Sequence, residues 1–148
     1  MILDERSEFC DATALNTGGA ASYLIGDVMD LGTDGLNDVE ELYLVIQVDT
    51  SVTSGGAGTY GFALCSDAQA AIAVDGSQTT HFATAQIPKA TLVAGYEICK
   101  VALPKGTYER YLGIVQTTAV AAATAGKVNA FLTRTPVTQK SFDAPFQL

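Results

Sequence analysis

The chain has 148 residues and combines a hydrophobic fraction of 48% with a charged fraction of only 16%. Eight lysines and arginines against 16 aspartates and glutamates give a net charge of −8. This argues against binding to nucleic-acid phosphates or to an anionic membrane, since both require clustered cations. No apolar run is long enough for a transmembrane helix, and the acidic start lacks the basic segment of a secretory signal.

The three cysteines are Cys10, Cys65 and Cys99, an odd number without close spacing. They predict neither a disulfide framework nor a zinc site. Cys65 and Cys99 lie in strand-like runs and are expected to be small buried hydrophobes. Such a chain folds naturally in a reducing cytoplasm.

A chain of this length is most simply one domain. Within it we expect three segments. Residues 1–19 are weakly patterned and end in a glycine-rich break, so we expect an N-terminal arm, within which Phe9–Leu15 could be a short strand or a turn of helix. A jelly-roll domain should span 20–135. Residues 136–148, with two prolines and two phenylalanines, should form an extended tail.

Alternating apolar and polar residues predict a series of short strands between turn signals. In chain order the expected strands are 22–31, 42–48, 59–66, 81–87, 96–103, 111–118 and 125–133. The only fair helix candidate is Asp67–Gly76. The pattern predicts an all-β fold, an antiparallel β-sandwich or jelly roll of about seven or eight strands.

The core-facing side chains follow from the two-residue period of a strand. Leu44, Ile46, Leu112 and Ile114 should be buried in the sandwich. The last two strands are expected to pair as an antiparallel hairpin at the centre of a sheet. Phe131 interrupts the apolar alternation of the final strand, which makes it a candidate for facing a partner.

The segment from Asp30 to Glu41 matches a calcium-binding loop at its first, fifth, sixth and twelfth positions, with Asp38 at the ninth. Gly32 fails the third position, and the flanking segments are strand-like where an EF-hand needs helices. Aspartate, asparagine and glycine also gather in ordinary turns. We therefore expect a plain acidic loop, and the sequence leaves open whether it ever binds calcium.

No catalytic, cofactor-binding or metal site is predicted, and we expect that the protein is not an enzyme. A nucleophile–histidine pair would have to use His81, the only histidine, and no nucleophile elbow occurs in the sequence. Glu40 and Glu41 are adjacent, so on a strand they point to opposite faces and cannot flank one glycosidic bond. The glycine-rich run Gly55–Gly58 precedes a strand without a following lysine, which excludes a phosphate-binding loop.

A set of segments spread along the chain carries a family resemblance. These segments are Met1–Asp4, Ile25–Gly32, Glu41–Val48, Phe62–Asp67, Leu92–Gly95, Leu103–Pro104, Arg110–Val115 and Thr124–Leu132. In order and spacing, the sequence resembles the small phage head proteins known as capsid cement or decoration proteins of the Bordetella-phage type. The resemblance implies a jelly roll that sits over junctions between major capsid proteins and clamps them. It also implies self-association, with a homodimer expected and a trimer possible, but it supplies no individual binding residue.

We therefore expect a structural virion protein that binds the outside of an icosahedral phage head and cements major capsid protein subunits. Its partners would be the major capsid protein lattice and itself, without nucleic acid or membrane, and it would fold in the bacterial host cytoplasm before joining the capsid surface. The alternative is a carbohydrate-binding jelly-roll module of a phage fibre. Its sugar platform would be drawn from Tyr43, Tyr60, Tyr96, Tyr108 and Tyr111, although the absence of tryptophan weakens that reading.

Overall fold

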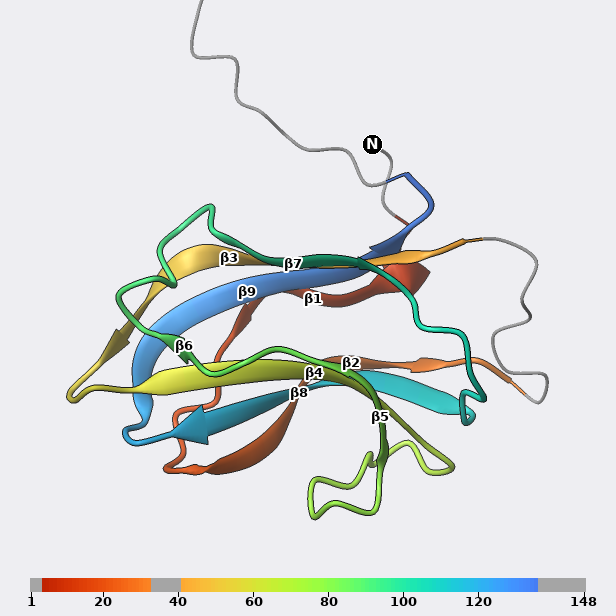
Figure 1. The fold of residues 1–148 in the computed structure, drawn as a ribbon, viewed down its shortest axis with the longest axis horizontal. Helices are drawn as coiled ribbons and strands as arrows, with labels where there is room; N and C mark the ends of the chain where they lie inside the picture. Colours follow the sequence, from red (N-terminus) through yellow and green to blue (C-terminus); the bar gives the residue numbers. More distant parts are fainter. Residues whose placement is uncertain (1–3, 33–40, 136–148) are drawn as a thin grey trace, which may run out of the picture.

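A computed structural model describes residues 4–32 and 41–135, which form two antiparallel β-sheets packed face to face (Figure 1). Sheet A has the strand order β1-β9-β3-β7, and sheet B has the order β2-β8-β4-β5 with the short β6 beside β4. The elements are η1 (Glu5–Ser7), β1 (Glu8–Ala14), β2 (Ala21–Asp30), β3 (Tyr43–Ser54), β4 (Thr59–Asp67), β5 (Thr79–Ala83), β6 (Ile87–Pro88), β7 (Glu97–Ala102), β8 (Tyr111–Ala119) and β9 (Ala123–Thr133). The predicted all-β sandwich is confirmed, with nine strands in the described residues.

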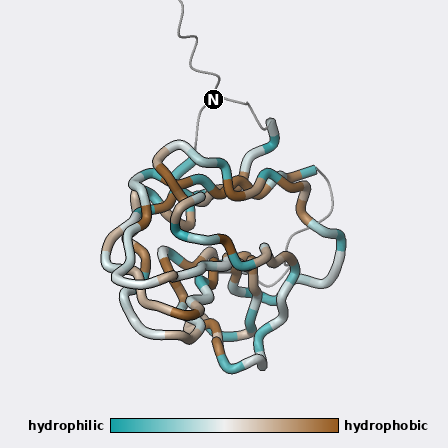
Figure 2. The backbone as a smooth tube through the Cα atoms, turned by 60° about the vertical axis from the view of Figure 1, so that its left-hand side comes forward, coloured by the Kyte–Doolittle hydropathy of each residue, from teal (hydrophilic) through white to brown (hydrophobic). Residues whose placement is uncertain are grey.

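One hydrophobic core fills the space between the sheets because alternate side chains of each strand point inward. Leu44 and Ile46 of β3 lie in it with Leu112 and Ile114 of β8, and all four are 0% exposed, as the sequence predicted. Hydrophobic stretches run along both layers (Figure 2). Val115, one residue out of phase with Ile114, joins a second apolar cluster on the outer face of sheet B.

The last two long strands lie in different sheets, so the expected hairpin is wrong. β8 pairs with β2 and β4, whereas β9 pairs with β1 and β3. The link of residues 120–122 turns the chain from one sheet to the other, with Val120 at a φ of 69°. Because the two strands lie in different sheets, their apolar rows face the same core from opposite sides. In a hairpin within one sheet, the two rows would lie side by side and would not cover each other.

The segment expected to be an arm contributes a strand from Glu8 onward. Phe9 and Cys10 of β1 are each 1% exposed, and β1 pairs with β9 at the edge of sheet A. Gly26, at the bulge of β2, has a φ of 69°, and a Cβ there would collide with the Phe9 carbonyl oxygen. The two edge strands thus meet closely, so the arm prediction does not hold for residues 8–14.

The helix predicted for Asp67–Gly76 is absent, and no described residue is α-helical. The Asp67 carboxylate instead accepts the backbone N–H groups of Gln69 and Ala73, at 3.1 and 3.0 Å, which supports a turn. Ile72 then folds back onto the outer face of sheet B beside Gly113 and is 4% exposed. It follows that the described part of the chain offers no helix able to cross a membrane.

Two further boundaries differ from the prediction. β3 continues to Ser54, beyond the end expected at residue 48, and the strand expected over 81–87 is divided into β5 and β6. The predicted tail over 136–148, and residues 33–40 of the predicted acidic loop, lie outside the described residues.

Candidate functional site

Four connections lie together at one end of the sandwich, on the left of Figure 1. They join β1 to β2 (15–20), β3 to β4 (55–58), β6 to β7 (89–96) and β8 to β9 (120–122), and we call them the neutral end. The connections from β2 to β3, β4 to β5 and β7 to β8 leave from the opposite end, where β1 begins and β9 ends. We call that side the charged end, and it includes residues 4–7 and 134–135.

The two ends differ sharply in charge. The four connections of the neutral end contain a single charged residue, Lys89. The described connections and chain ends of the charged end contain Asp4, Glu5, Arg6, Glu41, Asp75, Lys105, Glu109, Arg110 and Arg134. No charged residue occurs between Asp49 and Asp67 or between Arg110 and Lys127, so both the tip of the β3–β4 turn and the β8–β9 corner are uncharged.

Side-chain hydrogen bonds fasten three of these connections to one another. The Tyr60 hydroxyl donates to the carbonyl of Ala121 at 3.1 Å, and the Ser54 hydroxyl donates to the carbonyl of Ala122 at 2.7 Å. The Lys89 ammonium donates to the Ser54 carbonyl at 2.7 Å. The one cation of the neutral end therefore holds the connection 89–96 against the end of β3.

The fourth connection is held by a buried glutamine. Gln116 of β8 is 0% exposed; its Oε1 accepts the Asn16 N–H at 2.8 Å and its Nε2 donates to the Asn16 carbonyl at 3.1 Å. Its Nε2 also donates to the Thr118 hydroxyl at 2.9 Å. This amide pairs with Asn16 as a neighbouring strand would, which fixes the chain where it crosses from sheet A to sheet B.

Exposed apolar side chains concentrate at the neutral end. Of the four large hydrophobic residues exposed in the described chain, Val93, Tyr96 and Val120 belong to it, at 50%, 37% and 74%, and only Val74 lies elsewhere. Val120 also combines a β-branched side chain with a positive φ of 69°, a conformation that such residues rarely adopt. Burial in the core does not explain this strain, because the side chain points into solvent.

A serine–histidine pair forms on the opposite side of the molecule. Ser66 of β4 lies 2.7 Å from His81 of β5, Oγ to Nε2, and its Oγ accepts the Glu109 N–H at 3.2 Å. The His81 ring stacks on Tyr108, with centroids 4.0 Å apart. Burial lowers the pKa of His81, and the nearby Glu109 carboxylate opposes that shift.

This pair is a structural clamp. Ser66 is 0% exposed, and its oxygen already accepts a backbone N–H. The clamp fixes the connection that carries Tyr108 and Glu109 onto β4 and β5. The sequence pointed to His81 but not to Ser66, which only the pairing of β4 with β5 brings to the histidine.

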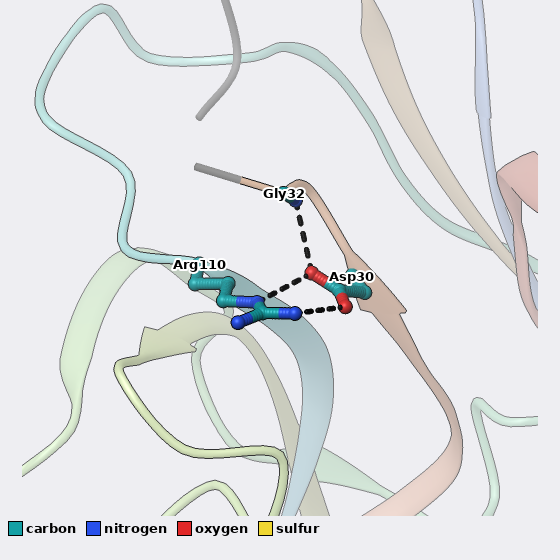
Figure 3. A network of polar contacts seen from close by, with 3 residues as sticks. All are labelled: Asp30, Gly32 and Arg110. Carbon is teal, nitrogen blue, oxygen red and sulfur yellow. Dashed lines mark hydrogen bonds and ion pairs between the residues drawn. The ribbon is translucent and has the colours of Figure 1, made fainter. Parts of the chain in front are cut away.

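An ion pair forms at the charged end, at the first residue of the segment that matches the calcium-loop pattern (Figure 3). Arg110 donates to both carboxylate oxygens of Asp30, each at 2.9 Å, and the Gly32 N–H donates to the same carboxylate at 2.9 Å. The bond to Arg110, followed by that to Gly32, lowers the pKa of Asp30 to about 2. The carboxylate of Asp30, the first residue of the calcium pattern, is thus already bonded to Arg110 and Gly32. The described residues contain no cluster of metal-binding side chains.

The tyrosines considered for a sugar platform are spread over different parts of the fold. Tyr60 is 0% exposed in the core, Tyr108 stacks on His81, and Tyr111 lies under the Arg110 guanidinium. Tyr43 faces outward on β3, in sheet A, and Tyr96 belongs to the neutral end. No single face gathers these five rings.

Phe131 is not available to a partner in the way the sequence suggested. It is 4% exposed, pairs with Val45 and Glu8 on the neighbouring strands, and belongs to the strand against which η1 lies.

The cysteines are all unpaired, and burial raises the pKa values of Cys10 and Cys99 to about 11. Both thiols are consequently weak nucleophiles.

Comparison with known proteins gives one family. The family model Bbp16 matches residues 9–132, from β1 to β9, and so covers both sheets. No curated protein matches the chain.

Proposed function

Because the chain belongs to the Bbp16 family, whose name points to a Bordetella phage protein, we propose that it is a structural protein of the phage head. It binds the outside of the icosahedral shell and cements major capsid protein subunits. It does so as a binding protein, without an enzymatic step.

The family match over both sheets carries this proposal. Three further features support it. The Ser66 hydroxyl of the Ser66–His81 pair is buried, the tyrosines are dispersed, and the connections at one end of the sandwich carry a single charged residue. Such a surface suits protein contacts, since the cores of interfaces are depleted in charge.

The mechanism rests on many weak contacts made together. A single copy contributes a small interface, and association costs several kcal/mol or more in lost translational and rotational freedom. A dimer or trimer that touches several lattice subunits avoids most of that cost for its second contact. The protein should therefore prefer assembled shells to free capsid subunits.

Co-sedimentation with phage heads tests the proposal. Heads assembled without this protein are mixed with it, pelleted and then heated, and free capsid subunits serve as the control. We expect retention on heads, little binding to free subunits, and a higher temperature of head disruption. Heads that neither retain the protein nor gain heat resistance would refute the proposal and favour the carbohydrate-binding alternative.

A deletion sharpens the same experiment. Removal of residues 136–148, which follow β9 at the charged end, should weaken binding to heads by removing a contact separate from that of the sandwich, while leaving the melting of the sandwich unchanged, because all nine described strands remain. Removal of residues 1–19 cannot serve this purpose, because it would delete β1 and the buried Phe9 and Cys10.

A further inference from the structure

We propose that the neutral end is the surface that docks on the capsid shell, and that it fits an uncharged recess in the folded shell protein. This inference rests on the proposed function and adds the contact surface and the chemistry of its partner.

Electrostatics single out this end. The chain carries a net charge of −8, yet the four connections of the neutral end contain only Lys89, whose ammonium is bonded to the Ser54 carbonyl. Burying an unpaired charge is costly, so a surface with a single charge, which is already hydrogen-bonded to a carbonyl, can be covered by a protein at a lower desolvation cost than the charged end. The same composition disfavours an anionic partner such as a nucleic acid, which would require free cations.

The strained backbone at Val120 points to a contact between its side chain and a partner. A β-branched residue at a φ of 69° costs stability, and the exposed valine recovers little of it within the chain. Buried against a partner, the same side chain would return apolar contact area. Val93 and Tyr96 add nothing at this corner, because residues 92–96 run beside β3 toward its middle, where the Val48 N–H donates to the Tyr96 carbonyl at 2.9 Å.

Hydrogen bonds that are already present in the free fold lower the cost of docking there. The bonds from Tyr60, Ser54 and Lys89 fix three connections relative to one another before any partner arrives. A Cβ at Gly58 would lie 2.8 Å from the Ala121 carbonyl oxygen, so the tip and the corner are in close contact. Less side-chain and loop ordering then opposes binding.

Shape favours the shell over a second copy. The connections project from the end of the sandwich (Figure 1). A projecting end buries most area in a recess, and two copies of one projecting end cannot offer each other a recess. A junction between larger shell subunits can provide it.

The test compares the same substitution at the two ends. Val120→Asp places a carboxylate in the neutral end, and aspartate tolerates a positive φ better than valine does. Val74→Asp is the matched control, since Val74 is 40% exposed in the connection between β4 and β5. Binding of each folded variant to heads lacking the protein is measured by co-sedimentation at low and high salt.

We expect Val120→Asp to weaken head binding by at least about tenfold and Val74→Asp to leave it within about twofold. Binding of the parent should change by less than about threefold between low and high salt, because no charge pairs form at this surface. Val120→Asn supplies a second variant: it should melt no lower than the parent, since asparagine accepts the positive φ, and still bind less tightly.

Other outcomes would overturn the inference. Equal binding by Val120→Asp and the parent would show that the neutral end is not the contact, and loss of binding only in Val74→Asp would assign it to the charged end. A change in the protein's own sedimentation without a change in head binding would assign the neutral end to self-association. If the parent itself fails to bind heads, the proposed function fails, which is a separate result.

Discussion

The two ends of this sandwich share one core but have opposite surfaces. The connections of the neutral end are mostly glycine and alanine, and their one cation, Lys89, is bonded to the Ser54 carbonyl. The charged end presents carboxylates and guanidinium groups, including the Asp30–Arg110 pair, in which both side chains are about half exposed. Both ends are fastened by hydrogen bonds, so the difference between them lies in charge rather than in order.

The contrast suggests different roles for the two ends: contacts at the charged end stabilise the fold, whereas the neutral end presents a surface suited to a partner. Polar contacts at the charged end, such as Ser66–His81, hold a connection against the strands. At the neutral end the polar groups bond inward and leave apolar atoms at the surface, as Val120 illustrates. Changes at the two ends should therefore differ in their response to pH and salt.

The largest expected effect is loss of the core on which both ends depend. Ile114→Ala should lower the free energy of unfolding by about 2–5 kcal/mol, and Ile114→Asp should cost more because it buries an unpaired charge. Val93→Ala, at a half-exposed position, is the control and should change little. Denaturant unfolding measures all three. Parent-like melting of Ile114→Asp would mean that the facing of β8 is wrong.

A smaller effect is expected from the glutamine that holds the neutral end. Gln116→Leu leaves the N–H and C=O groups of Asn16 without partners and should cost about 1–3 kcal/mol. Gln69→Leu makes the same change at an exposed position of the charged end and should be nearly neutral. Hydrogen exchange at Asn16 should accelerate in the first variant alone. Unchanged exchange there would show that this amide does not fasten the connection.

At the charged end, pH should act through His81. Its pKa lies below the ordinary value of 6.5 because burial disfavours the imidazolium, so the folded state binds fewer protons than the unfolded state. This contribution to stability is present above pH 6.5 and is lost as the pH falls through the lowered pKa of the folded state. Melting of the parent should therefore fall more than that of His81→Gln between about pH 7.5 and about pH 5. Equal pH dependence in the two proteins would exclude a role for His81.

The smallest expected effect concerns the exposed ion pair. Asp30→Asn removes a carboxylate whose pKa is about 2, so the loss should be the same at any pH well above the ordinary value of 3.8. The melting temperature should fall slightly at low salt and hardly at all at high salt, because exposed pairs are screened. Asp11→Asn, exposed on β1, is the control and should show no salt-dependent change. A loss that persists undiminished at high salt would mean that Asp30 acts mainly through its bond to Gly32.

The strands and the direction of their side chains were determined by the sequence itself. Alternation along 42–48 and 111–118 predicted that Leu44, Ile46, Leu112 and Ile114 would be buried, and they are. This succeeds because a strand has a period of two, so a local pattern is enough to assign its faces. The only predicted helix failed because Asp67 offers backbone N–H groups local bonds that favour a turn.

Only the tertiary structure decided how the strands are combined. The separation of β8 and β9 into two sheets, and the burial of Phe9 against β2, depend on which apolar rows meet across the core. Ser66 reaches His81, and Gln116 reaches Asn16, 100 residues earlier in the chain, through pairings that no local window contains. The neutral end likewise arises because four connections with one charged residue among them, scattered over the sequence, leave the sheets on the same side. The charge of each residue is local, but the strand topology decides which residues gather at one end.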